Sequence, residues 1–236
     1  MRPTVELGAI AVVLLVLLVV LGVVIHAGRS EGALSPDTLV VSQTDAPATL
    51  DPALATSPET WEIEYATCAK LLDYPARAGY AGTRVVAGVA ALPEISADRL
   101  TYRFRLSPGW RFSDGSPVTA AAFARALERA RSPALASPAD PYLREVRSWQ
   151  ASGLRLTIRL SQPAPDFLER LALPYFCAVP PGTPNLQSDR LPSAGPYAVV
   201  SYVPGSSLVL RRNPYYHGPR RGGVERVAYR FGEFPP

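Results

Sequence analysis

An α/β domain, in which a mixed sheet packs with helices, preceded by one N-terminal apolar helix, is the fold that the sequence predicts. Three stretches, at 102–106, 154–160 and 226–231, alternate apolar and polar residues with the period of two that marks half-buried strands. A segment with helical periodicity lies at 120–130. The stretch from Leu7 to Ile25 has no charged and no polar side chain. Strands that alternate with helices after one N-terminal apolar run indicate an α/β domain preceded by an apolar helix.

Composition favours one globular domain. Of the 236 residues, 47% are apolar and 19% are charged, which is enough to bury one substantial core. The net charge is only +4, so a nucleic-acid partner gains little support. Arginines do gather near the C-terminus around Tyr215 and Tyr216, but they are dispersed over a strand and a loop rich in Pro and Gly: Arg211, Arg212, Arg220, Arg221, Arg226 and Arg230. We interpret them as a solvated face.

The apolar run predicts a membrane segment. As a helix, Leu7 to Ile25 would be roughly 28 Å long, close to the thickness of the hydrocarbon core. We assign residues 1–27 to a transmembrane anchor or a signal segment; the length favours an anchor over a short signal. Residues 28–38 are small and polar and read as a linker, and 39–236 form the domain.

The first half of the domain contains five expected elements. A short strand covers Leu39 to Val41, and a helix is expected from Glu59 to Leu72, because Trp61, Tyr65, Cys68 and Leu72 then share one face. Residues 75–93 show no clear pattern. The strand at 102–106 turns into a second short strand at 110–112. Thr119 is a suitable N-cap for the helix at 120–130, with a hydrophobic staple between Val118 and Phe123.

The second half continues the alternation. A short helix follows the strand at 154–160, covering 165–173 and closed by Pro174. A compact apolar strand is expected at 175–179. A hairpin joins Tyr197–Val203 to Ser207–Arg212 through Pro-Gly-Ser, and the alternating stretch at 226–231 supplies one more strand.

The residue types favour binding over catalysis. Only two histidines exist, His26 and His217, and no GxSxG elbow is present, so a membrane-anchored hydrolase is the weakest functional reading. Cys68 and Cys177 lie far apart in sequence, without CxxC, HExxH or an EF-hand loop, which predicts no metal site. Phosphate-binding glycine motifs are absent as well. We therefore expect no catalytic residues, no cofactor and no enzymatic activity.

Four ordered motifs carry a resemblance to a known family. The run ADRLTYRFRLSPGWRFSDGSPVTA from Ala97 to Ala120 resembles the signature of family 5 bacterial solute-binding proteins, the oligopeptide, dipeptide and nickel binders, written approximately "dgltytFkLrpgvkFsDGtPvTA". Thr49 to Pro52 resembles the family's "tLDP", and 154–167 resembles "tltirLsqPapdF". Residues 195–216 resemble "GPYkl…y.pG..ivLerNp.Yw". Family members have about twice this length.

The resemblance implies a periplasmic-binding-protein-like lobe, incomplete, with most of the second lobe missing. The function implied is the substrate-binding component of an ABC importer for peptides or similar solutes, working with permease subunits. The domain would lie outside the cytoplasm, held to the cell membrane by a single N-terminal span, or secreted or periplasmic if the segment is cleaved. The alternative is a non-binding remnant or an interaction module at the membrane surface.

Two groups of ligand-binding residues are implied by the same resemblance. Peptide binders of the family grip the ligand backbone near the segment after "LDP", which corresponds to Ala55, Thr56, Ser57 and Pro58. A plain surface loop is the alternative for this group. The rim of the cleft would be lined by Ala194, Gly195 and Tyr197. Tyr197 fits a core aromatic equally well.

A disulfide between Cys68 and Cys177 is the last expectation. Both cysteines fall on apolar faces, and a domain exported as the resemblance implies sits in an oxidising compartment. The chain has two cysteines, so a bond between them leaves no free thiol. Two free buried thiols are the alternative.

Overall fold

The chain is described by a computed structural model that covers residues 37–220 and 222–232. The residues from Thr38 onward form one unit. Within this described part, no helix combines the length and the apolar character needed to cross a bilayer. The N-terminal apolar helix expected at 7–25, and with it the anchor or signal segment at 1–27, lies outside the described residues.

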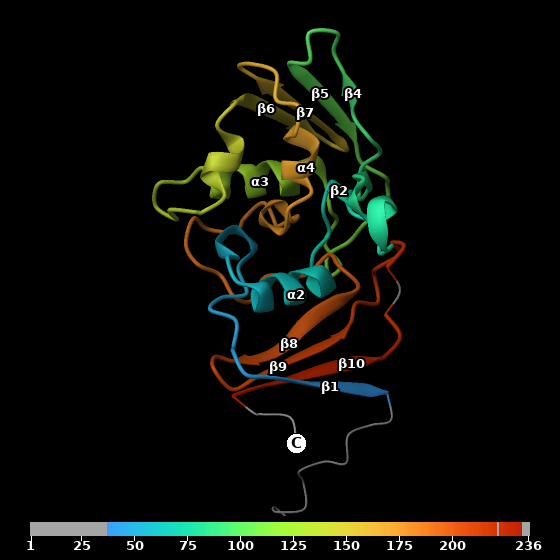
Figure 1. Cartoon of the computed structure of the whole chain (residues 1–236), viewed down its shortest axis with the longest axis vertical. Coiled ribbons are helices and arrows are strands. Elements are labelled where there is room, and N and C mark those ends of the chain that lie inside the picture. Colours follow the sequence, from blue (N-terminus) through green and yellow to red (C-terminus); the bar gives the residue numbers. More distant parts are fainter. Residues whose placement is uncertain (1–36, 221, 233–236) are drawn as a thin grey trace, which may run out of the picture. The chain divides into compact units, whose positions relative to one another are not determined.

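The first sheet is mixed and brings the two ends of the domain together. Its strands are β1 (Thr38–Gln43), β8 (Tyr197–Val203), β9 (Ser207–Arg212) and β10 (Arg226–Phe231), in the order β1-β10-β9-β8 (Figure 1). The strands β8, β9 and β10 form an antiparallel meander. The first strand, β1, joins β10 in parallel, with Leu39 opposite Val227. The predicted hairpin and the predicted last strand are confirmed.

The second sheet is antiparallel. It contains β4 (Glu94–Ile95), β5 (Thr101–Arg105), β7 (Arg155–Leu160) and β6 (Val146–Ser152), in the order β4-β5-β7-β6. The two central strands are those predicted from alternation. Strand β6 was not expected, because it lies at the sheet edge and most of its residues are exposed, so its sequence shows no apolar alternation.

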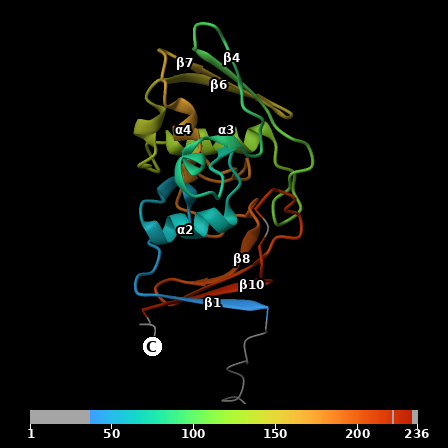
Figure 2. The same cartoon turned by 45° about the vertical axis from the view of Figure 1, so that its right-hand side comes forward.

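Two helices cover this second sheet. They are α3 (Ala120–Ala130) and α4 (Phe167–Leu171), and in both views they lie against one face of it (Figures 1 and 2). Phe123 and Leu127 of α3 are buried in one cluster with Phe104 of β5 and Leu156 of β7. The predicted helix at 120–130 is confirmed. Thr119 occupies its N-cap position with extended backbone, but its side chain makes no capping hydrogen bond.

Helix α2 (Pro58–Thr67) lies between the first sheet and the rest of the domain in both views (Figures 1 and 2). The expected helix from Glu59 to Leu72 is too long, because Cys68 adopts extended backbone angles and ends it. The chain then enters β2 (Leu72–Asp73), which pairs with β3 (Val86–Ala87). Of the four residues expected on one face, Cys68 and Leu72 are buried and Trp61 packs against the core, but Tyr65 is 46% exposed. Within α2 itself the buried positions are Thr60, Ile63 and Glu64.

Two other expected strands take different forms. Residues 110–112 form only an isolated bridge between Arg111 and Pro117. The apolar segment at 175–179 begins as a short 3₁₀ helix at Pro174–Phe176 and then continues without strand partners. Its apolar residues are nevertheless buried, so the pattern reported burial and not strand pairing. The other 3₁₀ helices of the described part are Pro52–Leu54, Gly79–Thr83 and Asp140–Leu143.

Candidate functional site

Asn213 holds the loop before β8 in place through hydrogen bonds. Its buried side-chain amide donates to the carbonyl oxygens of Ser193 (3.2 Å) and Gly195 (3.0 Å). The Asn213 backbone N–H donates to the carbonyl of Pro196 at 2.8 Å. Asn213 and Gly195 belong to the two halves of the fourth sequence motif, so this motif marks a physical contact.

The glycine at 195 permits a close approach of two backbones. Its N–H donates to the carbonyl oxygen of Thr67 at the end of α2, at 2.8 Å. A Cβ atom placed on Gly195 would lie 2.4 Å from the carbonyl carbon of Thr67 and 2.6 Å from the nitrogen of Cys68. Any side chain at this position would therefore push the loop away from α2.

The turn of the long motif meets the same loop. Ser113 donates its backbone N–H to the Ser193 carbonyl (2.8 Å), and the Ser193 N–H donates to the Ser113 hydroxyl (3.1 Å). The rings of Trp110 and Tyr216 make an edge contact at 5.5 Å. Motifs that lie far apart in the sequence thus converge around residues 193–197.

The Leu-Asp-Pro motif is held by a buried ion pair. Arg129 of α3 donates from Nη1 and Nη2 to the two carboxylate oxygens of Asp51, at 2.8 and 2.6 Å, and both side chains are almost completely buried. The same guanidinium donates to the carbonyls of Pro184 and Leu186. Asp51 also accepts from the backbone N–H of Ser188. One side-chain pair therefore ties together three segments of the domain.

The first predicted group of ligand-binding residues lies at the start of α2. Ser57 is the N-cap residue, and its hydroxyl accepts from the Thr60 N–H at 3.3 Å. Thr56 and Pro58 are exposed, whereas Ala55 is completely buried in the core. The backbone of Ala55 is also engaged, because its N–H donates to the Pro52 carbonyl at 3.2 Å and its carbonyl accepts from Trp61 Nε1 at 2.8 Å.

The second predicted group lies at the other end of α2, about 15 Å away on the rise of a ten-residue helix. Ala194 is buried, and the ring of Tyr197 belongs to the core of the first sheet, with its hydroxyl donating to the carbonyl of Val224 at 2.8 Å. The structure therefore does not join the two groups into one contiguous site.

A pocket adjoins the second group. It encloses about 430 Å³ and is lined by Pro196, Arg212, Asn213, Tyr216, His217, Gly218 and Gly222. This volume falls in the range of pockets that bind small ligands. The Arg212 guanidinium, which also lies 3.4 Å from the Glu225 carboxylate, gives the pocket a cation. The sequence analysis assigned Arg212 and His217 no role in binding. The arrangement suits a carboxylate-bearing or amide-bearing solute.

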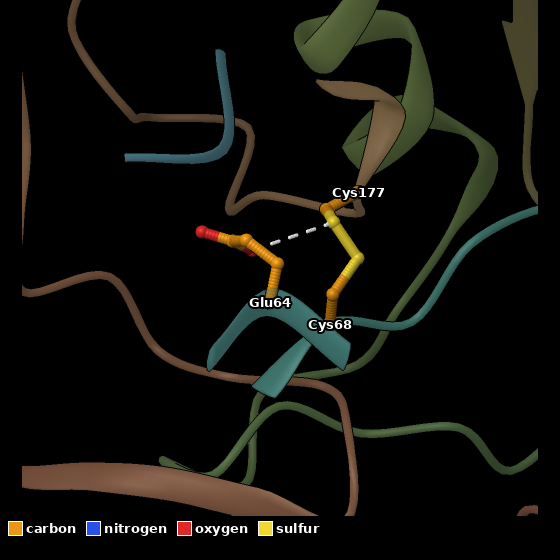
Figure 3. Close-up of side chains that lie close together, drawn as sticks. All are labelled: Glu64, Cys68 and Cys177. Atoms are coloured by element: carbon orange, nitrogen blue, oxygen red, sulfur yellow. Dashed lines mark hydrogen bonds between the residues drawn. A yellow bond between two sulfur atoms is a disulfide. The ribbon is translucent and has the colours of Figure 1, made fainter. Parts of the chain in front are cut away.

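A second cluster contains the predicted cysteine pair and a carboxylate, Glu64, to which the sequence assigns no role. Cys68 and Cys177 are joined in the structure as a disulfide, with Cα atoms 5.5 Å apart, and one oxygen of the Glu64 carboxylate lies beside Cys177 (dashed line in Figure 3). Glu64 Oε2 lies 3.6 Å from Cys177 Sγ. The Cα separation fits the range that a disulfide requires. The bond itself stays a prediction that thiol chemistry tests.

The Glu64 carboxyl sits in an unusual environment for an acid. Burial raises its pKa well above the usual range, and the negative charge of Asp51 raises it further. The acid is therefore protonated in the folded chain at pH values where it is ionised in the unfolded chain.

Replacing Glu64 with glutamine is expected to flatten the pH dependence of stability. Because the pKa of Glu64 is higher in the folded than in the unfolded chain, its contribution to stability is fully present below the unfolded value near 4.5. This contribution is lost as the pH rises toward the folded-state pKa. The wild type should thus lose free energy of unfolding as the pH rises above about 4.5, whereas Glu64→Gln should lose less and be the more stable protein at the upper end of the range measured. Urea unfolding across this pH range measures the free energy of unfolding of both proteins. Glu59→Gln, on the same helix, is the control and should follow the wild type; a Glu64→Gln curve parallel to the wild type would contradict the prediction.

Comparisons with known proteins agree on one family. The model of "Bacterial extracellular solute-binding proteins, family 5 Middle" matches residues 49–234. The chain is 29% identical over 202 residues to the probable D,D-dipeptide-binding periplasmic protein DdpA of Escherichia coli, covering 80% of this chain and 38% of DdpA. It is 26% identical over 156 residues to the periplasmic oligopeptide-binding protein OppA of Salmonella typhimurium, covering 56% of this chain and 29% of OppA.

Solved structures show the same fold. Clavulanic acid biosynthesis oligopeptide binding protein 2 superposes with a TM-score of 0.71 at 27% identity, covering 84% of this chain and 40% of that chain. The peptide-binding pheromone receptor PrgZ superposes with a TM-score of 0.73 at 16% identity, covering 84% and 43%. The chain thus spans less than half the length of these relatives.

Proposed function

Because the chain belongs to the bacterial extracellular solute-binding proteins of family 5, we propose that it supplies the first lobe of the substrate-binding component of an ABC importer for peptides or similar solutes. The observation that carries this proposal is the family match, which extends over almost all described residues. Residues 39–236 would form this lobe; the part of the chain that matches DdpA covers 38% of DdpA. The relatives named for dipeptides and oligopeptides support the solute class.

We place one part of the solute-binding surface at the loop 194–197 and the adjoining pocket lined by Arg212, and call it the first wall. The segment 55–58 forms a second, separate part, the second wall. The support for the first wall is the convergence of the family motifs on Ser193 and Gly195. Arg212 lies on the pocket side of β9, where it would pair with a solute carboxylate. Backbone groups near Thr56 would meet the solute from the other end of α2.

A lone lobe is expected to bind peptide weakly. Receptors of this kind bury the solute between two lobes, so one lobe offers only part of the contacts and leaves the rest to water. Losing about 4 kcal/mol of contacts moves a micromolar site to about millimolar. Calorimetry of the full chain with a mixed peptide library measures this. Micromolar binding by a monomer would show that the lobe assignment is wrong.

We further propose that the domain lies outside the cytoplasm and that the segment 1–27 anchors it or directs its export. The uncharged run from Leu7 to Ile25 supports this, as does the periplasmic location in the names of the relatives. A reporter enzyme that is active only after translocation, fused after Pro236, is expected to be active. Deleting residues 1–27 should abolish the activity. An inactive fusion of the full chain, with protein present in the cytoplasm, would contradict the proposal.

A further inference from the structure

We propose that the reduced form of the protein binds one thiophilic divalent cation, of the class of Zn²⁺, through Glu64, Cys68 and Cys177. One carboxylate oxygen and the two sulfur atoms all lie within 4.8 Å of one another (Figure 3). All three side chains are buried, at 3%, 5% and 2% exposure. In their reduced form they make a compact set of two soft donors and one hard donor.

The elements that carry the three residues hold them in place. Glu64 lies in the last turn of α2 and Cys68 is its C-cap residue, whose backbone N–H donates to the Glu64 carbonyl at 2.8 Å. Cys177 follows the 3₁₀ helix Pro174–Phe176, and its neighbour Ala178 donates its N–H to the carbonyl of Ala69 at 2.9 Å. The set is therefore built on ordered backbone and not on a loop tip.

Among the residues that the structure describes, the Glu64 carboxyl has no cationic partner of its own. Other buried carboxylates of the described part are neutralised: Asp51 pairs with Arg129, and Glu145 pairs with Arg170 at 2.6 Å. The only hydrogen-bond contact recorded for the Glu64 side chain among the described residues is with Cys177 Sγ. A disulfide sulfur has no proton to donate, so this carboxyl oxygen faces the sulfur without a donor. A bound cation would pair with the ionised carboxylate, which burial without a partner disfavours.

A small cavity adjoins the three residues. It has a volume of about 30 Å³ and is lined by Glu64, Cys68 and Cys177 together with apolar neighbours, such as Ile63 and Val179, and polar ones: Thr67, Asp189 and Ser193. This is about the volume that one water molecule needs. Zn²⁺ in proteins is four-coordinate with Cys, His and carboxylate ligands, and three protein ligands leave one position for water. The two thiolates select a soft cation over Mg²⁺ or Ca²⁺.

The cation and the disulfide exclude each other. Oxidation joins the two thiolates into one S–S bond, and the two electrons pass to an oxidant of the disulfide class, such as oxidised glutathione, which is cleaved to two thiolates. The cation keeps its charge and leaves, because a disulfide has lost the thiolate donors. Reduction by a dithiol reverses the electron flow and restores the site. The same three residues thus have a metal-binding state and a cross-linked state.

Co²⁺ is a direct probe, because its thiolate complexes absorb in the near ultraviolet. The full chain, in detergent, is reduced, freed of metal and titrated with CoCl₂. We expect a thiolate charge-transfer band that saturates at one Co²⁺ per chain, that Zn²⁺ abolishes by competition, and that is absent after oxidation with oxidised glutathione. A reduced wild type without such a band would overturn the proposal.

Two substitutions separate this site from other thiol–metal contacts. Glu64→Gln keeps the shape of the side chain and should weaken Co²⁺ binding at least about tenfold, since even groups that only orient a metal ligand change affinity about 10- to 100-fold. Glu59→Gln, at the start of the same helix, should bind as the wild type does. Cys68→Ser should abolish the band. Equal affinities for Glu64→Gln and Glu59→Gln would contradict the three-residue site even if Cys68→Ser fails to fold.

Discussion

Replacing Arg129 with methionine is expected to lower the free energy of unfolding by about 3–5 kcal/mol, because it leaves the Asp51 carboxylate buried without its partner. The guanidinium makes two hydrogen bonds to Asp51 and one each to the carbonyls of Pro184 and Leu186. A methionine fills much of the volume but supplies no donor. Urea unfolding followed by circular dichroism measures the difference.

Two controls make this test specific. Glu128→Gln on the same helix removes an exposed ion pair with Arg125 and should change the stability by about 1 kcal/mol or less. The double variant Asp51→Leu/Arg129→Met removes both charges, so it should be less destabilised than the sum of the two single variants. An Arg129→Met variant within about 1 kcal/mol of the wild type would contradict the structural role of this pair.

Reducing the bond between Cys68 and Cys177 is expected to cost about 4–5 kcal/mol in the chain-entropy model, because the two residues are 109 positions apart. Urea unfolding with and without reductant, in the presence of a chelator so that no cation stabilises the reduced form, measures the cost. Reductant should have no effect on a variant in which both cysteines are serine.

Thiol labelling tests the same bond independently. The unfolded, non-reduced protein should show no reactive thiol. Two labelled thiols, or a wild type whose stability is insensitive to reductant, would contradict the disulfide.

The parts of the fold that were predictable are those whose burial alternates along the chain. Strands β5, β7 and β10 have one face in a core and one in solvent, so their pattern is visible in sequence. Edge strand β6 is mostly exposed and gave no such signal. The end of α2 was misplaced because Cys68 is buried after the helix has stopped, and an apolar residue looks the same in either state.

The candidate site was predictable only in part. The motifs around Gly195 and Asn213 pointed to the loop at 193–197, but their direct hydrogen bonds became visible only in three dimensions. The approach of Glu64 to the cysteine pair had no sequence signal, since Cys177 lies more than 100 positions from both Glu64 and Cys68 and the three residues match no metal-ligand spacing. Short sequence motifs indicate local structure only, whereas this cluster forms when segments far apart in the sequence pack together.

Saturation-transfer NMR from the full chain to short peptides is the most direct test of the proposed lobe, because it detects weak binding and compares variants under equal conditions. We expect saturation transfer with a dissociation constant of about millimolar. Arg212→Gln, in the pocket, should weaken it severalfold, whereas Arg211→Gln, the exposed neighbour on β9, should leave it unchanged. No transfer to any peptide at several times that concentration, or equal binding by both variants, would contradict the account.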